Sequence, residues 1–331
     1  MTAADQISTT PQFGQYPPAT SLIVHLSDTH FLADSAALYG SVDTDGSVTQ
    51  AMAQLERSGL RPAAIVLTGD IADRGEADAY QRVRKIVETT AERLGSVVVW
   101  VMGNHDDRAA FRSTLLREAV PIEPAPIEHP VEYHSTDQPS AERHSIELPV
   151  DQVFDIDGLR IIALDTTVPG YHHGDLTEAQ LAWLVDVLST PAARGTLLAL
   201  HHPPVPTPLP LMSLIELREQ TRLADVIEGS DIRAILGGHL HYATTGMFAG
   251  IPVSVAAATC YTMDVSAPER ELSGVAGGTS LNLVHVYDDQ IVHSVVPIGA
   301  FDVTTHFSAS FLDRMEALSA DERLEAFSRH A

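Results

Sequence analysis

The chain has 331 residues, of which 44% are hydrophobic and 19% are charged, a composition typical of a globular protein. Its 44 acidic and 20 basic residues give a formal net charge of −24. Such a surface repels polyanions and no Lys/Arg run offsets it locally, so we expect neither DNA nor RNA as a partner. A single cysteine, Cys260, excludes an intrachain disulfide and favours a reducing compartment.

The sequence gives no sign of membrane insertion or export. No apolar run approaches the roughly 20 residues that a membrane-spanning helix needs. Residues 1–20 are rich in Thr, Gln, Ala and Pro, and they lack the basic start and apolar stretch of a signal peptide. We therefore predict a disordered leader over 1–20 and a cytoplasmic protein.

The chain from residue 21 to about 116 alternates apolar segments with amphipathic ones. Strands are predicted over 22–26, 64–67 and 97–101, and helices over about 47–58 and 76–94. Strands that are apolar throughout and alternate with helices indicate an α/β sheet that is covered on both faces.

The pattern is interrupted over 118–150, where Pro, Glu and His recur without a period and predict a long irregular loop. Beyond it, Asp157-Gly158 between two apolar runs predicts a hairpin, and Thr177 to Gln180 predicts a helix with a capping box. A Gly-rich exposed loop is expected over 266–279. The remaining strands are predicted over 196–200, 232–236, 251–258, 281–287 and 291–297, and the remaining helices over about 211–228 and 308–328.

Five short polar motifs carry the residue types that bind metals, and four of them directly follow clear apolar strands. They are Asp28-Thr29-His30, Gly69-Asp70, Gly103-Asn104-His105-Asp106, His201-His202 and Gly238-His239-Leu240-His241. Ligands of open α/β sheets bind beyond the carboxyl ends of the strands, so one common site is predicted. In both pairs spaced by two, Asp28 with His30 and His239 with His241, an extended backbone would point the two side chains the same way.

Carboxylate, amide and imidazole donors together suit two closely spaced transition-metal ions. Asp70 could bridge two cations roughly 3.5–4 Å apart, and coordination could lower the pKa of a bridging water to about 7, giving a hydroxide that attacks phosphorus. Asn104 would bind without adding negative charge, which leaves the site attractive to a phosphodiester anion. His105, next to a ligand, is the candidate general acid, with Asp106 or Asp73 to orient it.

Each motif by itself is also an ordinary turn or loop sequence, and the joint site is favoured because five such motifs carry compatible donors. Several other polar residues are given structural interpretations. His202 is expected to face away from the site, Cys260 to be a small buried hydrophobe, and Asp73-Arg74 to form a local ion pair. His172 and His173 either reach a bound phosphate or lie in a surface loop. The apolar stripe over 311–327 is interpreted as packing or a dimer contact.

The ordered set of Asp28-x-His30, Gly69-Asp70, Gly103-Asn104-His105-Asp106, His201 and Gly238-His239-x-His241 resembles the calcineurin-like metallophosphoesterases. Longer segments are similar to bacterial class III cyclic-nucleotide phosphodiesterases, and the likeness covers roughly residues 20–300. The segments are Leu67 to Asp70, Trp100 to Arg108, Leu200 to Pro204, Gly238 to Tyr242, Ile251 to Cys260 and Asn282 to Tyr287.

The resemblance implies an α/β fold, a four-layer αββα sandwich of two mixed β-sheets flanked by helices. The catalytic domain would span 21–300, and the helical tail predicted from the residue pattern over 301–331 lies beyond the part that the resemblance covers. One metal ion would be held by Asp28, His30, Asp70 and His241, and the second by Asp70, Asn104, His201 and His239. The family further implies iron with manganese or two manganese ions, His105 as proton donor, and a homodimer. Candidate substrate contacts are His30, Asp70, Asn104, His105, His241 and His172.

The resulting hypothesis is a hydrolase that converts 3′,5′-cyclic AMP to the 5′-monophosphate, with cyclic GMP as a further candidate substrate. One alternative is a broader phosphodiesterase that acts on 2′,3′-cyclic nucleotides or other diesters. Another is a regulatory module that uses metals to hold a nucleotide or phosphoprotein without turnover. The presence of His105, a candidate general acid, argues against the second alternative.

Overall fold

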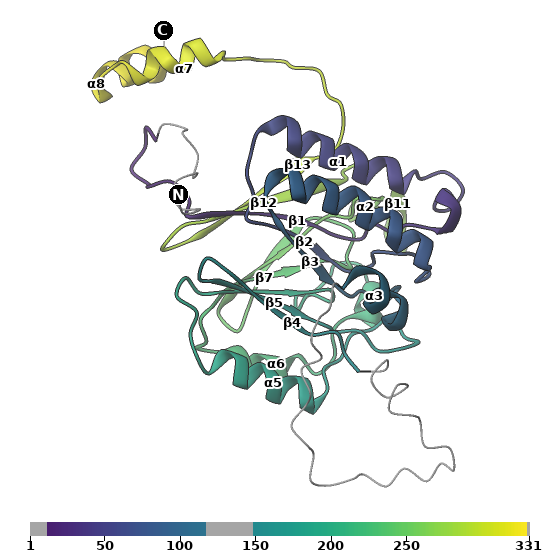
Figure 1. Ribbon diagram of the computed structural model, residues 1–331. Coiled ribbons are helices and arrows are strands. Elements are labelled where there is room, and N and C mark those ends of the chain that lie inside the picture. The colour runs from purple at the N-terminus through teal and green to yellow at the C-terminus, as the bar shows by residue number, and fades with distance from the viewer. Residues whose placement is uncertain (1–11, 117–147, 330–331) are drawn as a thin grey trace, which may run out of the picture.

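The computed structural model describes residues 12–116 and 148–329. Two β-sheets face each other, and helices cover the outer face of each (Figure 1). This is the four-layer α/β sandwich that the family resemblance implies. The leader over 1–20 falls partly, and the loop over 118–150 mostly, outside the described residues.

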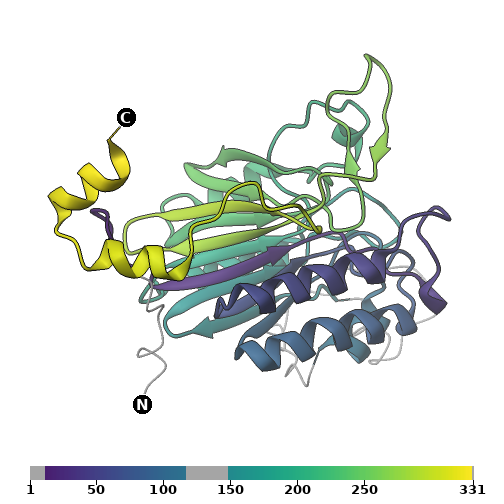
Figure 2. The ribbon, with the colours of Figure 1, turned by 90° about the horizontal axis from the view of Figure 1, so that it is seen from above.

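The first sheet has five strands in the order β13-β12-β1-β2-β3. β1 (Ser21–Leu26), β2 (Ala64–Thr68) and β3 (Val97–Val101) pair in parallel. β12 (Ser280–Val286) pairs antiparallel with both β1 and the edge strand β13 (Ile291–Pro297). The helices on its outer face are α1 (Thr44–Ser58), α2 (Ala77–Leu94) and α3 (Arg108–Leu115). Figures 1 and 2 show α1 and α2 side by side on that face.

The second sheet has six strands in the order β4-β5-β6-β7-β9-β8. Their bounds are β4 Gln152–Ile156, β5 Leu159–Leu164, β6 Thr196–Leu200, β7 Ile232–Gly237, β8 Thr244–Phe248 and β9 Ile251–Val255. It is covered by α5 (Glu178–Leu188), which has the predicted capping box at Thr177, and by α6 (Gln220–Ile227). A separate two-stranded ribbon pairs β10 (Thr262–Met263) with β11 (Gly274–Val275).

Apolar side chains fill the space between the two sheets. Ile23 and Val66 from the first sheet and Ile161, Leu197 and Leu236 from the second are all fully buried there. The opposite faces of the same strands pack against the helices in two further clusters. Burial on both faces explains why these strands are apolar throughout, and it fixes the carboxyl ends of both sheets relative to each other.

Some predicted elements differ from the structure. The helix expected over 211–228 is divided into a 3-10 turn, η3 (Met212–Ile215), and α6, because Leu217 between them is buried and forms a bridge with Gly174. The loop expected over 266–279 contains β11. The strand expected over 251–258 ends at Val255, and β8, α3 and a 3-10 turn, η2 (Ala33–Ser35), were not predicted.

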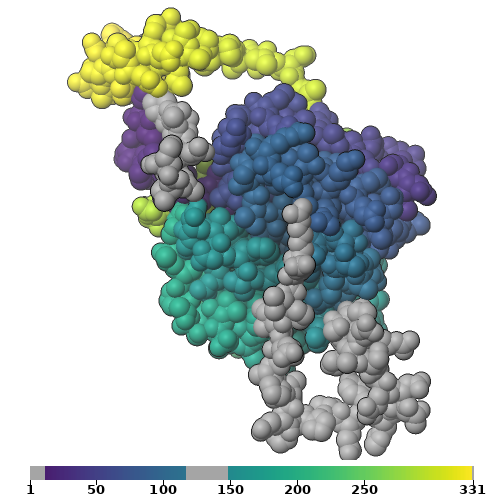
Figure 3. Space-filling view, in the orientation of Figure 1, coloured from purple at the N-terminus to yellow at the C-terminus, as the bar shows by residue number. Residues whose placement is uncertain are grey.

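The tail forms three short helical pieces, α7 (Ala309–Glu316), α8 (Ala320–Arg323) and a π-helical turn, η4 (Leu324–Ser328). None of its described residues is buried, and Figures 1 and 3 show it extending away from the two sheets. Phe307, Phe311 and Phe327 pack on one another, and the Arg323 guanidinium lies over Phe13. Across residues 12–116 and 148–329, no helix combines the length and apolar character required to cross a bilayer.

The core between the sheets gives a stability prediction. Ile161 on β5 is 0% exposed and β5 carries none of the candidate ligands, so Ile161→Ala is expected to lower the free energy of unfolding by about 2–5 kcal/mol. Val295→Ala on the edge strand β13, where Val295 is 54% exposed, should change it by about 0.5 kcal/mol or less. Urea denaturation of both variants checks this, and equal losses would contradict the assigned core.

Candidate metal centre

The five polar motifs lie together, as the sequence predicts, where the carboxyl ends of the two sheets meet. Three motifs follow β1, β2 and β3 of the first sheet, and two follow β6 and β7 of the second. The packing between the sheets therefore holds the two halves of the site in register. All seven candidate ligands reach this point: Asp28, His30, Asp70, Asn104, His201, His239 and His241.

The backbone at these motifs is not extended, so the predicted cause of convergence is wrong. Asp28, His30, His239 and His241 have φ values of 54°, 46°, 66° and 59°, all in the left-handed region. Such φ values are uncommon for residues with a Cβ and persist where the surroundings hold them. At the first motif, the N–H groups of Asp28 and His30 donate to the carbonyl oxygens of Gly69 and Asp70. Left-handed turns, and not strand alternation, aim these side chains.

Four buried side chains form the first cluster. The ligand atoms of Asp28, His30, Asp70 and His241 all lie within 4.8 Å of one another. His30 Nε2 is 3.5 Å from Asp70 Oδ2, and His241 Nε2 is 3.4 Å from Asp28 Oδ1. Two carboxylates and two imidazoles at one point are a donor set that fits a transition-metal ion.

A second cluster begins at the same carboxylate. Asp70 Oδ2 is 3.4 Å from His201 Nε2, which lies 3.1 Å from Asn104 Oδ1. The rings of His201 and His239 are 5.0 Å apart at their centroids. Asp70 thus contacts both groups of donors, which is the position that a bridging ligand requires.

His202 does not face away from the site as expected. Its ring centroid lies 4.9 Å from that of His201 and 4.6 Å from that of His239. Its Nδ1 is bonded to Thr166 Oγ1 at 2.8 Å and its Nε2 to the carbonyl oxygen of His172 at 3.1 Å. The ring therefore supports the loop that carries His172. Strand alternation ends with β6 at Leu200, so it does not fix the direction of the two histidines that follow.

Asp73 supports the site in a way that its sequence context does not show. The expected pair with Arg74 exists at 3.6 Å, but Arg74 is 74% exposed. The closer partner of Asp73 is His30, whose Nδ1 lies 3.0 Å from Asp73 Oδ1. Partners of this kind orient a metal-binding imidazole and increase its basicity.

Backbone carbonyl oxygens orient the other imidazoles. His201 Nδ1 lies 2.7 Å from the Thr68 oxygen, His241 Nδ1 lies 3.2 Å from the Tyr261 oxygen, and His239 Nε2 lies 3.0 Å from the Ile215 oxygen. These contacts leave Nε2 of His201 and His241, and Nδ1 of His239, for coordination.

The two candidates for orienting His105 have different roles. His105 Nδ1 donates to the backbone oxygen of Asp73 at 2.8 Å. Asp106 instead accepts bonds from the N–H groups of Ile71, Ala72 and Gly103 and from the Tyr80 hydroxyl, which ties the motif loop together. Burial, with Asp70 nearby, raises the pKa of Asp106 to about 6.

The electrostatics of the site centre on Asp70. Burial opposes its ionisation, but His201, His30 and His105 outweigh burial and hold the pKa of Asp70 well below its usual range. Burial likewise lowers the pKa of His201, and the contact with Asp70 reverses this and raises it to about 9. Asp70 is thus a buried anion that requires cations around it. At His241 burial lowers the pKa and the nearby Asp28 carboxylate raises it. Burial dominates, and the pKa of His241 falls to about 4.

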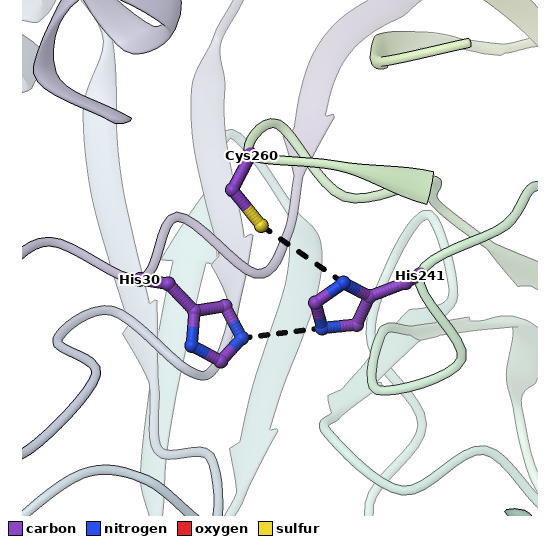
Figure 4. Close-up of side chains that lie close together, drawn as sticks. All are labelled: His30, His241 and Cys260. Atoms are coloured by element: carbon purple, nitrogen blue, oxygen red, sulfur yellow. Dashed lines mark hydrogen bonds between the residues drawn. The ribbon is translucent and has the colours of Figure 1, made fainter. Parts of the chain in front are cut away.

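Cys260 lies beside the Nδ1 edge of His241, as Figure 4 shows, with its Sγ 3.9 Å from His241 Nδ1. On the other side of that ring, His241 Nε2 is 3.2 Å from His30 Nε2. Cys260 packs with Leu32, Leu38 and other apolar residues, and burial raises the pKa of its thiol well above the usual value. It is therefore the small buried hydrophobe that the sequence predicts.

Residues 21–243 match the family described as Calcineurin-like phosphoesterase. The chain belongs to this family. It is 48% identical, over 88% of its length and 84% of the relative, to a Mycobacterium tuberculosis protein named cAMP/cGMP dual specificity phosphodiesterase. It is 49% identical, over 86% of each chain, to a Rhodococcus erythropolis protein named probable cyclic nucleotide phosphodiesterase. A dimetal phosphatase from Danio rerio shares the fold, with a TM-score of 0.54 at 15% identity over 85% of this chain and 99% of that one.

The role of Asp73 can be tested by metal affinity. Asp73→Ala removes the carboxylate from His30 and is expected to weaken metal binding by roughly 10–100-fold. Arg74→Ala removes the exposed partner of the same carboxylate and should leave the affinity unchanged. Competition with a metal chelator measures both variants, and equal affinities would show that the contact of Asp73 with His30 has no effect on the ion.

Proposed function

We propose that this chain is a dinuclear-metal phosphodiesterase that hydrolyses 3′,5′-cyclic AMP and cyclic GMP to the nucleoside 5′-monophosphates. The observation that carries this proposal is the position of Asp70 between two groups of N/O donors, with His105 beside them. The names of the Mycobacterium and Rhodococcus relatives support the substrate class. The net charge of −24 also favours a small anion drawn to bound cations over a nucleic acid.

The donor set fits two transition-metal ions. We assign one ion to Asp28, His30, Asp70 and His241, and the other to Asp70, Asn104, His201 and His239. Iron with manganese, or two manganese ions, would suit these N/O ligands. When bound, such ions supply a water activated at neutral pH and neutralise charge on the phosphate.

His105 is suited to deliver a proton to the leaving oxygen. Its N–H donates to Asp70 Oδ1 at 2.9 Å, so its backbone is fixed to the shared carboxylate. Its ring is fixed through Nδ1 to the Asp73 oxygen, which leaves Nε2 for the leaving group. The side chain is 30% exposed, and Asp73 Oδ1 lies 3.7 Å from Nδ1, so a carboxylate lies beside the ring.

His172 supports the side-chain amide of Asn104 on the exposed side of the site. Its Nδ1 accepts a hydrogen bond from Asn104 Nδ2 at 2.9 Å, and its ring centroid lies 5.1 Å from that of His105. Because the amide nitrogen is engaged by His172, the amide oxygen of Asn104 faces His201. We therefore place His172 with His30, Asp70, Asn104, His105 and His241 around the phosphate.

We further propose a cytoplasmic homodimer. The single cysteine favours a reducing compartment. Exposed apolar side chains of the tail, among them Phe307, Leu324 and Phe327, offer a contact surface for a second copy.

The proposed reaction is tested by metal analysis and a substrate panel on the purified protein. We expect two transition-metal ions per chain and faster turnover of 3′,5′-cyclic AMP and cyclic GMP than of 2′,3′-cyclic AMP or bis-p-nitrophenyl phosphate. Negligible turnover of the 3′,5′-cyclic nucleotides beside the other diesters would favour the broader phosphodiesterase. Metal and nucleotide binding without any turnover would favour the regulatory module.

The role of His105 gives a separate prediction. His105→Ala is expected to slow diester hydrolysis by about 10²–10⁴-fold with an unchanged metal content, because a general acid is lost and no assigned ligand changes. His173→Ala is the matched control. The His173 ring lies 5.1 Å from the ring of Tyr171, and its loss should leave activity intact. Full activity of His105→Ala would refute the acid role.

A further inference from the structure

Two tyrosines extend the metal centre on the side away from His172. The Tyr261 ring lies 4.5 Å from the His241 ring at their centroids, and the Tyr261 backbone oxygen contacts His241 Nδ1 at 3.2 Å. The Tyr39 ring lies 5.6 Å from the Tyr261 ring in an edge arrangement, with the two hydroxyl oxygens 3.5 Å apart. We call Tyr39 and Tyr261 the tyrosine platform.

The platform is the end of a continuous row of rings that passes the candidate ligands. Neighbouring ring centroids in the row lie between 4.5 and 5.6 Å apart. In order, the row contains His172, His105, His30, His241, Tyr261 and Tyr39. The row therefore places the platform directly beside His241, a candidate ligand, on this side of the metal centre.

Tyr39 is held out into solvent by a fixed turn. It is 75% exposed, with a φ of 52°, and the next residue, Gly40, has a φ of 73°. A left-handed backbone is an outlier for a bulky residue and is kept where the surroundings impose it. The neighbouring Leu38 is 2% exposed and bridges to Val42, so the base of the turn is packed.

The segment before this turn is also anchored. The Arg82 guanidinium binds the Leu32 carbonyl oxygen and the Asp45 carboxylate, and the Asp34 N–H donates to Asp78 at 2.9 Å. Figure 2 shows the loop between β1 and α1 and the β10–β11 ribbon projecting at the same end of the molecule. The anchored loop therefore holds the exposed Tyr39 ring in a defined position, where it can contact a bound molecule.

Tyr261 is positioned as tightly. A Cβ added at Gly274, on β11, would lie 2.7 Å from a carbon of the Tyr261 ring, so the ring packs against the backbone of the ribbon. With His241 on one side and Gly274 on another, the Tyr261 ring has little freedom. It links the exposed Tyr39 to the metal centre as a rigid spacer.

We propose that the tyrosine platform is the nucleobase subsite, and this proposal rests on the proposed function. A nucleotide whose phosphate lies at the metal centre would stack its base on Tyr39, with Tyr261 as the inner wall. Base–aromatic stacking tolerates any base because each one has a π face. The platform would therefore add affinity for adenine and guanine alike and would not discriminate between them.

The experiment is calorimetric titration of the manganese-loaded full chain with AMP, GMP and ribose 5-phosphate, which needs no turnover. Tyr39→Leu is expected to weaken AMP and GMP binding by about tenfold, from the loss of stacking. Its affinity for ribose 5-phosphate, which has no base, should change by less than twofold. Tyr39→Phe keeps the ring and should bind AMP within twofold of the unchanged chain.

Tyr171→Leu is the matched control, because Tyr171 is a 61% exposed tyrosine in the loop that carries His172 and lies outside the platform. It should bind all three ligands as the unchanged chain does. The proposed nucleobase subsite is refuted if Tyr39→Leu binds AMP with normal affinity, or if its affinities for AMP and ribose 5-phosphate fall equally. It is also refuted if Tyr171→Leu weakens AMP binding as strongly as Tyr39→Leu does. If cyclic nucleotides are not hydrolysed but Tyr39→Leu still loses AMP selectively, the proposed function fails and the subsite stands.

Discussion

The contact of one carboxylate with donors from both sheets is the interaction on which the site depends. Asp70 follows β2 in the first sheet, yet its Oδ2 lies 3.4 Å from His201, which follows β6 in the second. Asp70 is 2% exposed, and a buried anion is tolerated only with compensating positive charge or hydrogen bonds. The apolar packing between the sheets therefore has a chemical consequence, because it keeps the two halves of a cation site together around one anion.

The supporting contacts divide the work between side chains and backbone. Asp73 contacts the His30 ring through its carboxylate and the His105 ring through its carbonyl oxygen, so one residue orients a candidate ligand and the candidate acid. The Asp106 carboxylate accepts backbone hydrogen bonds that hold the loop carrying Asn104 and His105. Gly103 in that loop is required by space, since a Cβ there would lie 2.0 Å from the Asp70 nitrogen. These contacts fix the site before any substrate arrives.

Local signals in the sequence were sufficient for an α/β sheet covered on both faces and for the gathering of the motifs, whereas the two facing sheets were expected only from the family resemblance. Apolar strands such as 97–101 mark burial on both faces, and the residues after them mark the carboxyl edge. The left-handed turns at Asp28 and His239 carry no such signal, since their φ values are imposed by contacts made in the folded chain. The contacts of the Thr68 and Ile215 carbonyl oxygens with the ligand histidines also could not be predicted, because every residue has a backbone carbonyl oxygen.

Long-range contacts explain the remaining errors. The helix expected over 211–228 is interrupted where Leu217 pairs with Gly174, a contact across 43 residues that no local pattern encodes. Tyr39 looked unremarkable in the sequence, and its place beside Tyr261 depends on the meeting of two distant loops.

Anomalous diffraction from crystals of the manganese-loaded protein tests the central claim most directly. We expect two manganese peaks that both lie within coordination distance of the Asp70 carboxylate, one also bound by Asp28, His30 and His241 and the other by Asn104, His201 and His239. A single peak, or two peaks that do not share Asp70, would contradict the account.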